Sequence, residues 1–259
     1  MTADRQPDSA ERYEREKAFH DERFAHDDRS ANRFYAIDAA SVREFERRIA
    51  ALPADADVLD YGCGSGAYAA IALARAPGRR VVAVDLSPVA LEQAAAAAEA
   101  AGVGGRIEFR EMNAEALEFE DATFDAVCGN GVLHHLDLER AYAEVARVMK
   151  PGGSGLFLEP MGHNPLINAY RRRTPEQRTP DEHPLLTADF DLARRWFAEV
   201  EPTYFSLLSL GTLPFAPARD SRRLIDRLDA VDRALFRRLP AAGRFAWLVL
   251  VALRGPRAA

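Results

Sequence analysis

Residues 58–66 read Val-Leu-Asp-Tyr-Gly-Cys-Gly-Ser-Gly, and no other stretch of the chain says more about its architecture. The apolar beginning predicts a buried strand over Asp57–Tyr61, and the alternate glycines predict a tight turn into a helix. Because they lack a Cβ, Gly62, Gly64 and Gly66 let the backbone approach a ligand closely. The spacing also satisfies a dinucleotide-binding pattern, so this stretch alone leaves the cofactor open.

Around this turn, short apolar runs alternate with segments of helical periodicity. We expect strands at residues 57–61, 80–85, 106–110, 124–129, 155–158, 201–210 and 244–253. We expect helices at residues 31–51, 67–76, 88–101, 137–149, 190–197 and 220–239. Short apolar strands separated by helices predict a doubly wound α/β fold, with a mostly parallel seven-stranded sheet, helices on both faces and an added helical substrate cover.

The composition is that of a globular protein, with 259 residues of which 48% are hydrophobic and 29% charged. The longest apolar run, residues 245–253, is much shorter than the roughly 20 residues of a membrane span. The charged N-terminus lacks the apolar segment of a secretory signal, and Cys63 and Cys128 lack metal-ligand spacing. We therefore expect a cytoplasmic protein without stable membrane insertion. The net charge of −6 argues against a nucleic-acid partner.

Two carboxylates help to distinguish the possible cofactors. Asp60 lies two residues before the first glycine, where it suits a cationic group and would repel a pyrophosphate. Asp85 ends the second expected strand, where a carboxylate can accept hydrogen bonds from two ribose hydroxyls. A dinucleotide or an adenosine cofactor would use Asp85, whereas Asp60 favours the cationic one.

An ordered set of motifs resembles the class I S-adenosylmethionine (SAM) dependent methyltransferases. Each motif is weak alone, but together they span residues 57–160, about 40% of the chain. The motifs are Leu59–Gly66, Val84–Ser87, Asn113–Glu115, Phe124–Val127, Asn130–Leu136 and Arg147–Gly153. The resemblance implies an N-terminal helical arm or cover at residues 1–50 and a SAM-binding, Rossmann-like core at 51–160. Substrate-cover insertions and the C-terminal strands, the last of them antiparallel, then occupy residues 161–259.

The resemblance also implies which residues bind SAM. Asp60 and the glycines would hold the methionyl part, Asp85 the ribose, and Leu86 the adenine. Asn113 stands where the family often has an aspartate on the adenine amino group. The implied cofactor-binding residues are Asp60, Gly62, Gly64, Gly66, Asp85, Leu86, Asn113, Ala114, Asn130 and Gly131.

Three side chains are candidate catalytic residues. Glu159 ends the fifth expected strand, and ligands gather at the carboxyl ends of parallel strands. His163 follows it closely, and His135 belongs to a histidine pair with His134. Each could act as a base, but a strand-end carboxylate exposed to solvent and a histidine pair that only shapes the cofactor loop are competing interpretations.

A group of arginines follows the fifth strand in the part of the chain whose net charge is positive. Residues 151–259 carry a charge of +4, against −10 for residues 1–150. The arginines could clamp a carboxylate or phosphate of the acceptor, or form a solvated helix face paired with nearby acidic residues. The candidate acceptor-binding residues are Arg171, Arg172, Arg173 and Arg178.

Two flanking segments remain open in function. Residues 220–239 form an amphipathic helix that could be a substrate lid, a homodimer face or a membrane-surface helix, and the acidic residues on it favour core packing or a lid. His20, with Phe19 and Asp21, belongs either to an arm closing over the site or to a surface helix.

We therefore expect methyl transfer from SAM to a small-molecule acceptor that is anionic, with O-, N- and C-methylation left open. An in-line displacement at a sulfonium methyl needs alignment above all, and a base only where the acceptor loses a proton. The sequence lacks the Asp-Asn pair of metal-dependent catechol methyltransferases, so we expect no metal. The alternatives are an NAD-dependent oxidoreductase, against which Asp60 and the turn Lys150–Gly153 argue, and a non-catalytic SAM-fold module.

Overall fold

The structure, a computed structural model, describes residues 9–26, 37–215 and 221–257. Its strands are β1 (Asp57–Tyr61), β2 (Arg80–Asp85), β3 (Ile107–Glu111), β4 (Phe124–Asn130), β5 (Met149–Pro160), β6 (Phe197–Phe205) and β7 (Leu248–Pro256). Its α-helices are α1 (Ser9–His26), α2 (Ala39–Ala50), α3 (Tyr68–Ala74), α4 (Pro88–Ala100), α5 (Leu138–Val148), α6 (Pro165–Arg173), α7 (Thr187–Trp196) and α8 (Ser221–Arg238).

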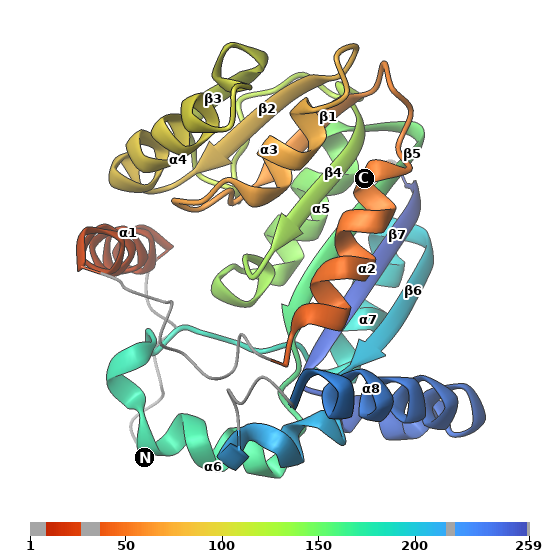
Figure 1. Cartoon of the computed structure of the whole chain (residues 1–259). Coiled ribbons are helices and arrows are strands. Elements are labelled where there is room, and N and C mark those ends of the chain that lie inside the picture. Colours follow the sequence, from red (N-terminus) through yellow and green to blue (C-terminus); the bar gives the residue numbers. More distant parts are fainter. Residues whose placement is uncertain (1–8, 27–36, 216–220, 258–259) are drawn as a thin grey trace.

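The seven strands form one sheet in the order β3-β2-β1-β4-β5-β7-β6 (Figure 1). Strands β1 to β5 pair in parallel, whereas β7 runs antiparallel to both β5 and β6. The order reverses between β1 and β4, and at such a point the loops after the two strands part and leave a crevice for a ligand. The predicted doubly wound α/β fold, including its antiparallel last strand, is confirmed.

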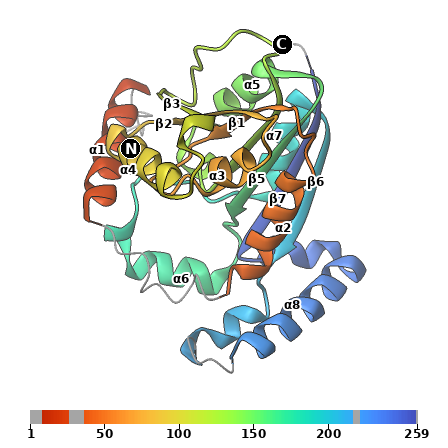
Figure 2. The ribbon, with the colours of Figure 1, turned by 45° about the horizontal axis from the view of Figure 1, so that its top comes forward.

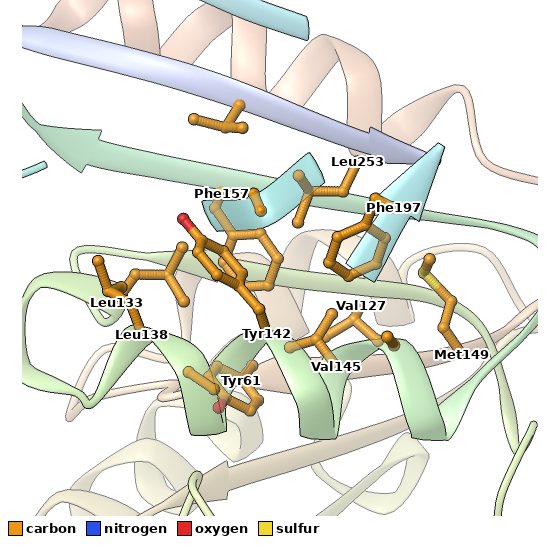
Figure 3. Packing of buried hydrophobic residues seen from close by; sticks show 14 of the residues in the cluster. Tyr61, Val127, Leu133, Leu138, Tyr142, Val145, Met149, Phe157, Phe197 and Leu253 are labelled. Atoms are coloured by element: carbon orange, nitrogen blue, oxygen red, sulfur yellow. The ribbon is translucent and has the colours of Figure 1, made fainter. Parts of the chain in front are cut away.

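Helices bury both faces of the sheet. On one face α2, α3 and α4 pack closely on the strands, because small side chains such as Ala70 and Ala94 meet the sheet there. On the other face α5 and α7 pack through larger side chains, and the rings of Tyr142 and Phe197 meet edge to face (Figure 3). Burial on both faces explains why central strands such as β1 and β2 are nearly continuous apolar runs in the sequence.

Side-chain caps fix where several helices begin. Ser87 Oγ accepts a hydrogen bond from Ala90 N at 3.1 Å, which confirms Ser87 as the predicted N-cap of α4. Asp137 caps α5 in the same way. Asn164 caps α6, a helix that our strand and helix assignment did not include.

Three strand predictions were wrong in their boundaries. β5 begins at Met149 rather than at 155, because a register shift against β4 accommodates the glycine turn after Lys150. β6 spans Phe197–Phe205 rather than 201–210, since Ser206 (φ +61°) turns the chain away. β7 begins at Leu248 rather than at 244, because residues 240–245 form a 3-10 turn.

Three helices lie outside the two layers (Figures 1 and 2). α1 packs beside α4, near the end of β2, while α6 follows β5 directly and α8 packs near β6. α1 and α6 therefore border the edge of the sheet where the parallel strands end. Within the described ranges, none of the helices combines the length and apolar character needed to cross a membrane.

Candidate functional site

The glycine loop leaves β1 and turns back against the end of β4. Gly62 (φ +73°) and Gly64 (φ +58°) have left-handed backbone conformations, which glycine adopts without strain. A Cβ at Gly62 would overlap the side chain of Val132, just beyond β4. This close approach brings the ends of β1 and β4 together and explains the need for glycine there.

Two carboxylates flank the loop. Asp60 is 2% exposed and accepts a hydrogen bond from Ala70 N at 2.9 Å. Asp85, at the end of β2, accepts from Gly64 N at 2.8 Å and from Ser87 N at 3.0 Å. Burial raises the pKa of Asp60 to about 7 and also raises the pKa of Asp85, and the backbone N–H groups oppose this only in part. Both carboxylates would gain from a cationic or hydroxyl-bearing ligand.

The other expected cofactor residues lie at neighbouring strand ends. Leu86 is half-buried directly after β2, and the Asn113 side chain accepts a hydrogen bond from the backbone two residues on. The carbonyl of Ala114 accepts a hydrogen bond from the tyrosine hydroxyl of β1. Asn130 ends β4 and is exposed, and Gly131 (φ +70°) turns the chain after it. The structure therefore brings these residues to one edge of the sheet.

Helix α1 lies across this edge. Lys17 Nζ donates a hydrogen bond to the Leu86 carbonyl at 2.9 Å, and the Ser87 hydroxyl donates one to Asp21. Phe24 stands over the second glycine of the loop, with its ring 3.8 Å from the place of a Cβ. α1 thus covers the glycine loop and the end of β2, as an arm closing over the site would.

Glu159, at the end of β5, is fully buried and has both oxygens engaged. Its Oε1 accepts hydrogen bonds from Val132 N and Leu133 N, each at 2.9 Å. Its Oε2 lies 2.7 Å from His134 Nδ1, and the other ring nitrogen of His134 is 3.5 Å from Glu182. Burial lowers the pKa of His134, but the two carboxylates outweigh it and raise the pKa to about 9. Glu159 therefore holds the β4–α5 turn and a protonated His134.

His135 points from the same turn towards α1. Its Nδ1 lies 3.3 Å from Glu16 Oε2, and His20 Nε2 lies 3.5 Å from the same oxygen. The Thr179 hydroxyl donates a hydrogen bond to the other Glu16 oxygen. Burial and the charge of His134 lower the pKa of His135 to about 4, although Glu16 opposes the shift. A compact cluster of imidazole and carboxylate groups therefore joins α1 to the turn after β4.

His163 does not belong to this cluster. It is half-buried beyond the end of β5, and its Nε2 accepts a hydrogen bond from Thr187 N at 3.1 Å. Its ring nitrogen therefore connects the segment before α6 to the start of α7. Of the three catalytic candidates, the structure brings only Glu159 and His135 to the same turn.

The four arginines do not converge on one point. Arg171 is partly buried and donates to a backbone carbonyl just after β5, and burial lowers its pKa to about 10. Arg178 donates to the Arg171 carbonyl and to Glu182. Arg172 and Arg173 are exposed on α6. The four guanidinium groups therefore cannot all contact one small anion in this arrangement. Such a contact would need a shift of α6 or a large acceptor.

The donor and acceptor groups at the loop fit SAM. A carboxylate has about four lone-pair positions, and backbone N–H groups take two of those on Asp85, which leaves two for ribose hydroxyls. The Asp60 carboxyl, whose pKa burial raises to about 7, lies beside the loop, where the cationic methionyl part of SAM would favour its ionised form. Asn113 Oδ1 retains acceptor capacity for the adenine amino group.

Reasoning from sequence did not find every residue of this site. Glu16 and Lys17 reach partners on other elements that are at least 69 positions away, and they occur in a charged stretch that resembles a solvated helix. Glu182 was considered only as a counter-charge for the arginines. The aromatic residues Tyr13, Phe19 and Phe24 within this charged stretch were the only sequence signal considered that α1 packs against the rest of the protein.

Comparison with known proteins agrees with this geometry. Residues 58–153 match the model of a methyltransferase domain. A demethylmenaquinone methyltransferase of Thermus thermophilus is 41% identical over 103 residues, which cover 39% of this chain and 46% of that protein. The 27-O-demethylrifamycin SV methyltransferase of Amycolatopsis mediterranei is 35% identical over 49% of this chain and 46% of that protein. The chain spans less than half the length of these relatives.

Solved structures share the fold over most of the chain. A geranyl diphosphate methyltransferase in complex with SAM superposes with a TM-score of 0.58 at 19% identity, covering 83% of this chain and 85% of that chain. The [4+2]-cyclase SpnF superposes with a TM-score of 0.54 at 21% identity, covering 85% and 82%. Since one of these is a cyclase, the fold alone does not determine the reaction. Residues 58–153 are therefore similar to a methyltransferase domain, and the motifs and the strand order of the sheet agree with this similarity to the class I SAM-dependent methyltransferases.

Proposed function

We propose that this chain transfers a methyl group from SAM to a small-molecule acceptor. One observation carries the proposal: the buried Asp60 and the half-buried Asp85 lie on either side of a glycine loop at the point where the strand order reverses. A loop that held a pyrophosphate would place that anion beside the Asp60 carboxylate, at a cost in electrostatic repulsion. A sulfonium cofactor with an ammonium group has the opposite sign and is favoured there.

Each cofactor residue is assigned to one part of SAM according to its position. Asp60 and the glycine loop would hold the methionyl part, and Asp85 would accept the ribose hydroxyls. Leu86, Asn113 and Ala114 would line the adenine, and Asn130 with Gly131 the methionine side. SAM itself supplies the activated methyl group. The chain's contribution is to align the acceptor with that methyl and to exclude water, for which α1 is suitably placed.

Our assignment of the candidate bases follows their contacts. Glu159 has both oxygens occupied by N–H donors, so we assign it to positioning His134 and the turn after β4. His163 is engaged by Thr187, at the start of α7. His135 is the candidate that faces the cover helix α1, on the side where an acceptor would be enclosed. A base is needed only if the acceptor atom (O, N or C) must lose a proton when it receives the methyl group.

For the acceptor we propose an anionic small molecule. Support comes from Arg172 and Arg173, whose guanidinium groups are exposed on α6, directly after β5. The positive charge balance of residues 151–259 points the same way. Arg171 and Arg178 would hold the backbone around this surface in place through their hydrogen bonds to backbone carbonyls.

Turnover with labelled SAM tests the proposal. The full chain is incubated with methyl-labelled SAM and with matched pairs of acceptors that differ in a carboxylate or phosphate. We expect label in the acceptor, with a preference for the anionic member of each pair. Binding of SAM without transfer to any acceptor would favour the non-catalytic module, and equal transfer to both members of a pair would remove the anionic preference.

A further inference from the structure

Three potential ligand atoms meet between α1 and the turn after β4. They are Glu16 Oε2, His20 Nε2 and His135 Nδ1, and all three lie within 4.8 Å of one another. The carboxylate oxygen is 3.3 Å from the His135 nitrogen and 3.5 Å from the His20 nitrogen. Ligand atoms about 2.1 Å from a tetrahedral metal ion are separated by about 3.4 Å, so these two distances match the edges of such a site.

Two of these three atoms, Glu16 Oε2 and His135 Nδ1, are buried and lie close to each other without the geometry of a hydrogen bond. Neither Glu16 Oε2 nor His135 Nδ1 makes a hydrogen bond to any residue in the described ranges, although both are shielded from solvent. The Glu16 side chain is 6% exposed and the His135 side chain 10%. Buried polar atoms without partners cost free energy, and one cation would satisfy the carboxylate oxygen and both imidazole nitrogens together.

The surrounding charge also favours a cation. Of the three carboxylates around the histidines, Glu159 is paired with His134 and Glu182 with Arg178, which leaves the negative charge of Glu16 facing His135 and His20. His134 and Glu182 form a neighbouring group with His135. His134 is, however, already held by Glu159 at 2.7 Å, which leaves the first three residues as the available ligand set.

We propose that Glu16, His20 and His135 form a binding site for a divalent transition-metal ion, with Zn²⁺ as the best match. Two imidazole nitrogens and one carboxylate oxygen are the donors that Zn²⁺ accepts, with a fourth position left for water or another ligand. The Thr179 hydroxyl bonded to the second Glu16 oxygen orients the carboxylate, as outer-shell groups do in metal sites. The ion would fasten α1 to the turn after β4.

This inference goes beyond the proposed methyl transfer and differs from what the sequence alone led us to expect. Glu16 and His20 are more than 110 residues from His135, so no local motif signals the site. It also gives His135 the role of a metal ligand in place of a general base. Because the ion binds to the cover helix and SAM to the glycine loop, the two binding events can be measured separately.

The test uses the full chain, freed of any purification tag and stripped of metal with a chelator. Zn²⁺ is titrated in competition with a chromophoric chelator, and we expect one equivalent to bind. His20→Ala and Glu16→Gln should each weaken binding by more than about 100-fold, because even changes outside the ligand shell cost about 10- to 100-fold. Matched controls are Glu14→Gln, exposed on the same helix, and His183→Ala, a histidine outside the cluster.

Co²⁺ on the unaltered chain keeps the proposal testable if a variant fails to fold. We expect the intense visible absorption of four-coordinate Co²⁺, abolished by one equivalent of Zn²⁺, and slower hydrogen exchange in α1 when either ion is bound. Equal Zn²⁺ affinity in the ligand variants and the controls would overturn the proposal, as would a Co²⁺ spectrum indistinguishable from the aqueous ion. SAM affinity, measured in parallel on the stripped chain, keeps a failure here distinct from a failure of the proposed function.

Discussion

His134 Nδ1 lies 2.7 Å from Glu159 Oε2 in the interior, at the point where β5 ends and the turn after β4 begins. The pair places a charged imidazole beside a carboxylate that also accepts two backbone N–H groups. A buried ion pair of this kind fixes local geometry, and loss of one partner leaves the other uncompensated. The arrangement therefore points to a positioning role for Glu159.

Glu159→Gln should lower the free energy of unfolding by about 3 kcal/mol, because it leaves the buried His134 without its charged partner. Urea denaturation measures the loss, with the exposed Glu108→Gln as the control. SAM affinity should change by less than about threefold in the folded variant, which is about 0.6 kcal/mol. Unaltered stability together with a roughly 10²–10⁴-fold loss of turnover would instead identify Glu159 as the base.

Lys17→Ala should accelerate both association and dissociation of SAM or its product. Lys17 connects α1 to the Leu86 carbonyl at 2.9 Å and to Glu111 at 2.6 Å, so its loss loosens the cover over the glycine loop. Stopped-flow measurements should show each rate rising by about threefold to tenfold, less than for a buried charged hydrogen bond because solvent screens the partly exposed Lys17 and Glu111. Glu14→Ala, on the exposed face of α1, is the matched control, and identical rates in all three proteins would show that α1 does not gate the site.

Arg172→Ala and Arg173→Ala should each raise the KM of an anionic acceptor and leave SAM affinity unchanged. A charged hydrogen bond contributes about 1.5–3 kcal/mol, so the KM should rise by about tenfold to 100-fold. Steady-state kinetics with Arg237→Ala, an exposed arginine of α8, provides the comparison. If both variants behave like this control, the two arginines are a solvated face of α6.

Asp229→Asn should stabilise the protein at neutral and alkaline pH. Burial, and next to it Asp232, raise the pKa of Asp229 to about 6, while Ser209, Arg233 and Arg43 oppose the shift. Between the unfolded value of 3.8 and about 6 the folded chain binds the extra proton, so stability falls as the pH rises through this window.

An asparagine side chain does not titrate, so Asp229→Asn does not lose stability in this window. Its free energy of unfolding should exceed that of the unaltered chain by about 2–3 kcal/mol above pH 7, and the two values should be equal near pH 4. Urea denaturation at several pH values measures the advantage. Asp226→Asn, an exposed carboxylate on the same helix, serves as the control. A constant difference between Asp229→Asn and the unaltered chain across the pH range would contradict the assigned pKa.

The sequence was sufficient for the sheet and for the strand-end residues because these depend on local patterns. Strands β1 and β2 begin and end where the apolar runs predicted, and Ser87 caps α4 as its spacing before Pro88 indicated. The predicted ends of a strand were wrong where contacts with residues distant in the sequence determine where the strand begins or ends. Residues 240–245 form a 3-10 turn in which Gly243 packs against the ring of Tyr204, a contact that no local pattern indicated.

The cluster around Glu16 lay beyond sequence reasoning for the same physical reason. Its members come from α1, from the turn after β4 and from the segment before α7, and folding alone brings them together. Glu159 was correctly placed at a strand end, but sequence could not show that two backbone N–H groups and His134 occupy its oxygens. The role of a buried side chain depends on its hydrogen-bond partners, and these become visible only in the folded structure.

Calorimetric titration with S-adenosylhomocysteine, in the unaltered chain and in Asp85→Ala, tests the central claim most directly. The claim predicts micromolar binding, about −8 kcal/mol, and a weakening of about tenfold to 100-fold in the variant, because a charge-assisted hydrogen bond is lost. NADH, titrated in the same way, should not bind. Binding of NADH in place of S-adenosylhomocysteine, or equal affinity for S-adenosylhomocysteine in the variant, would contradict the assignment of this loop to SAM.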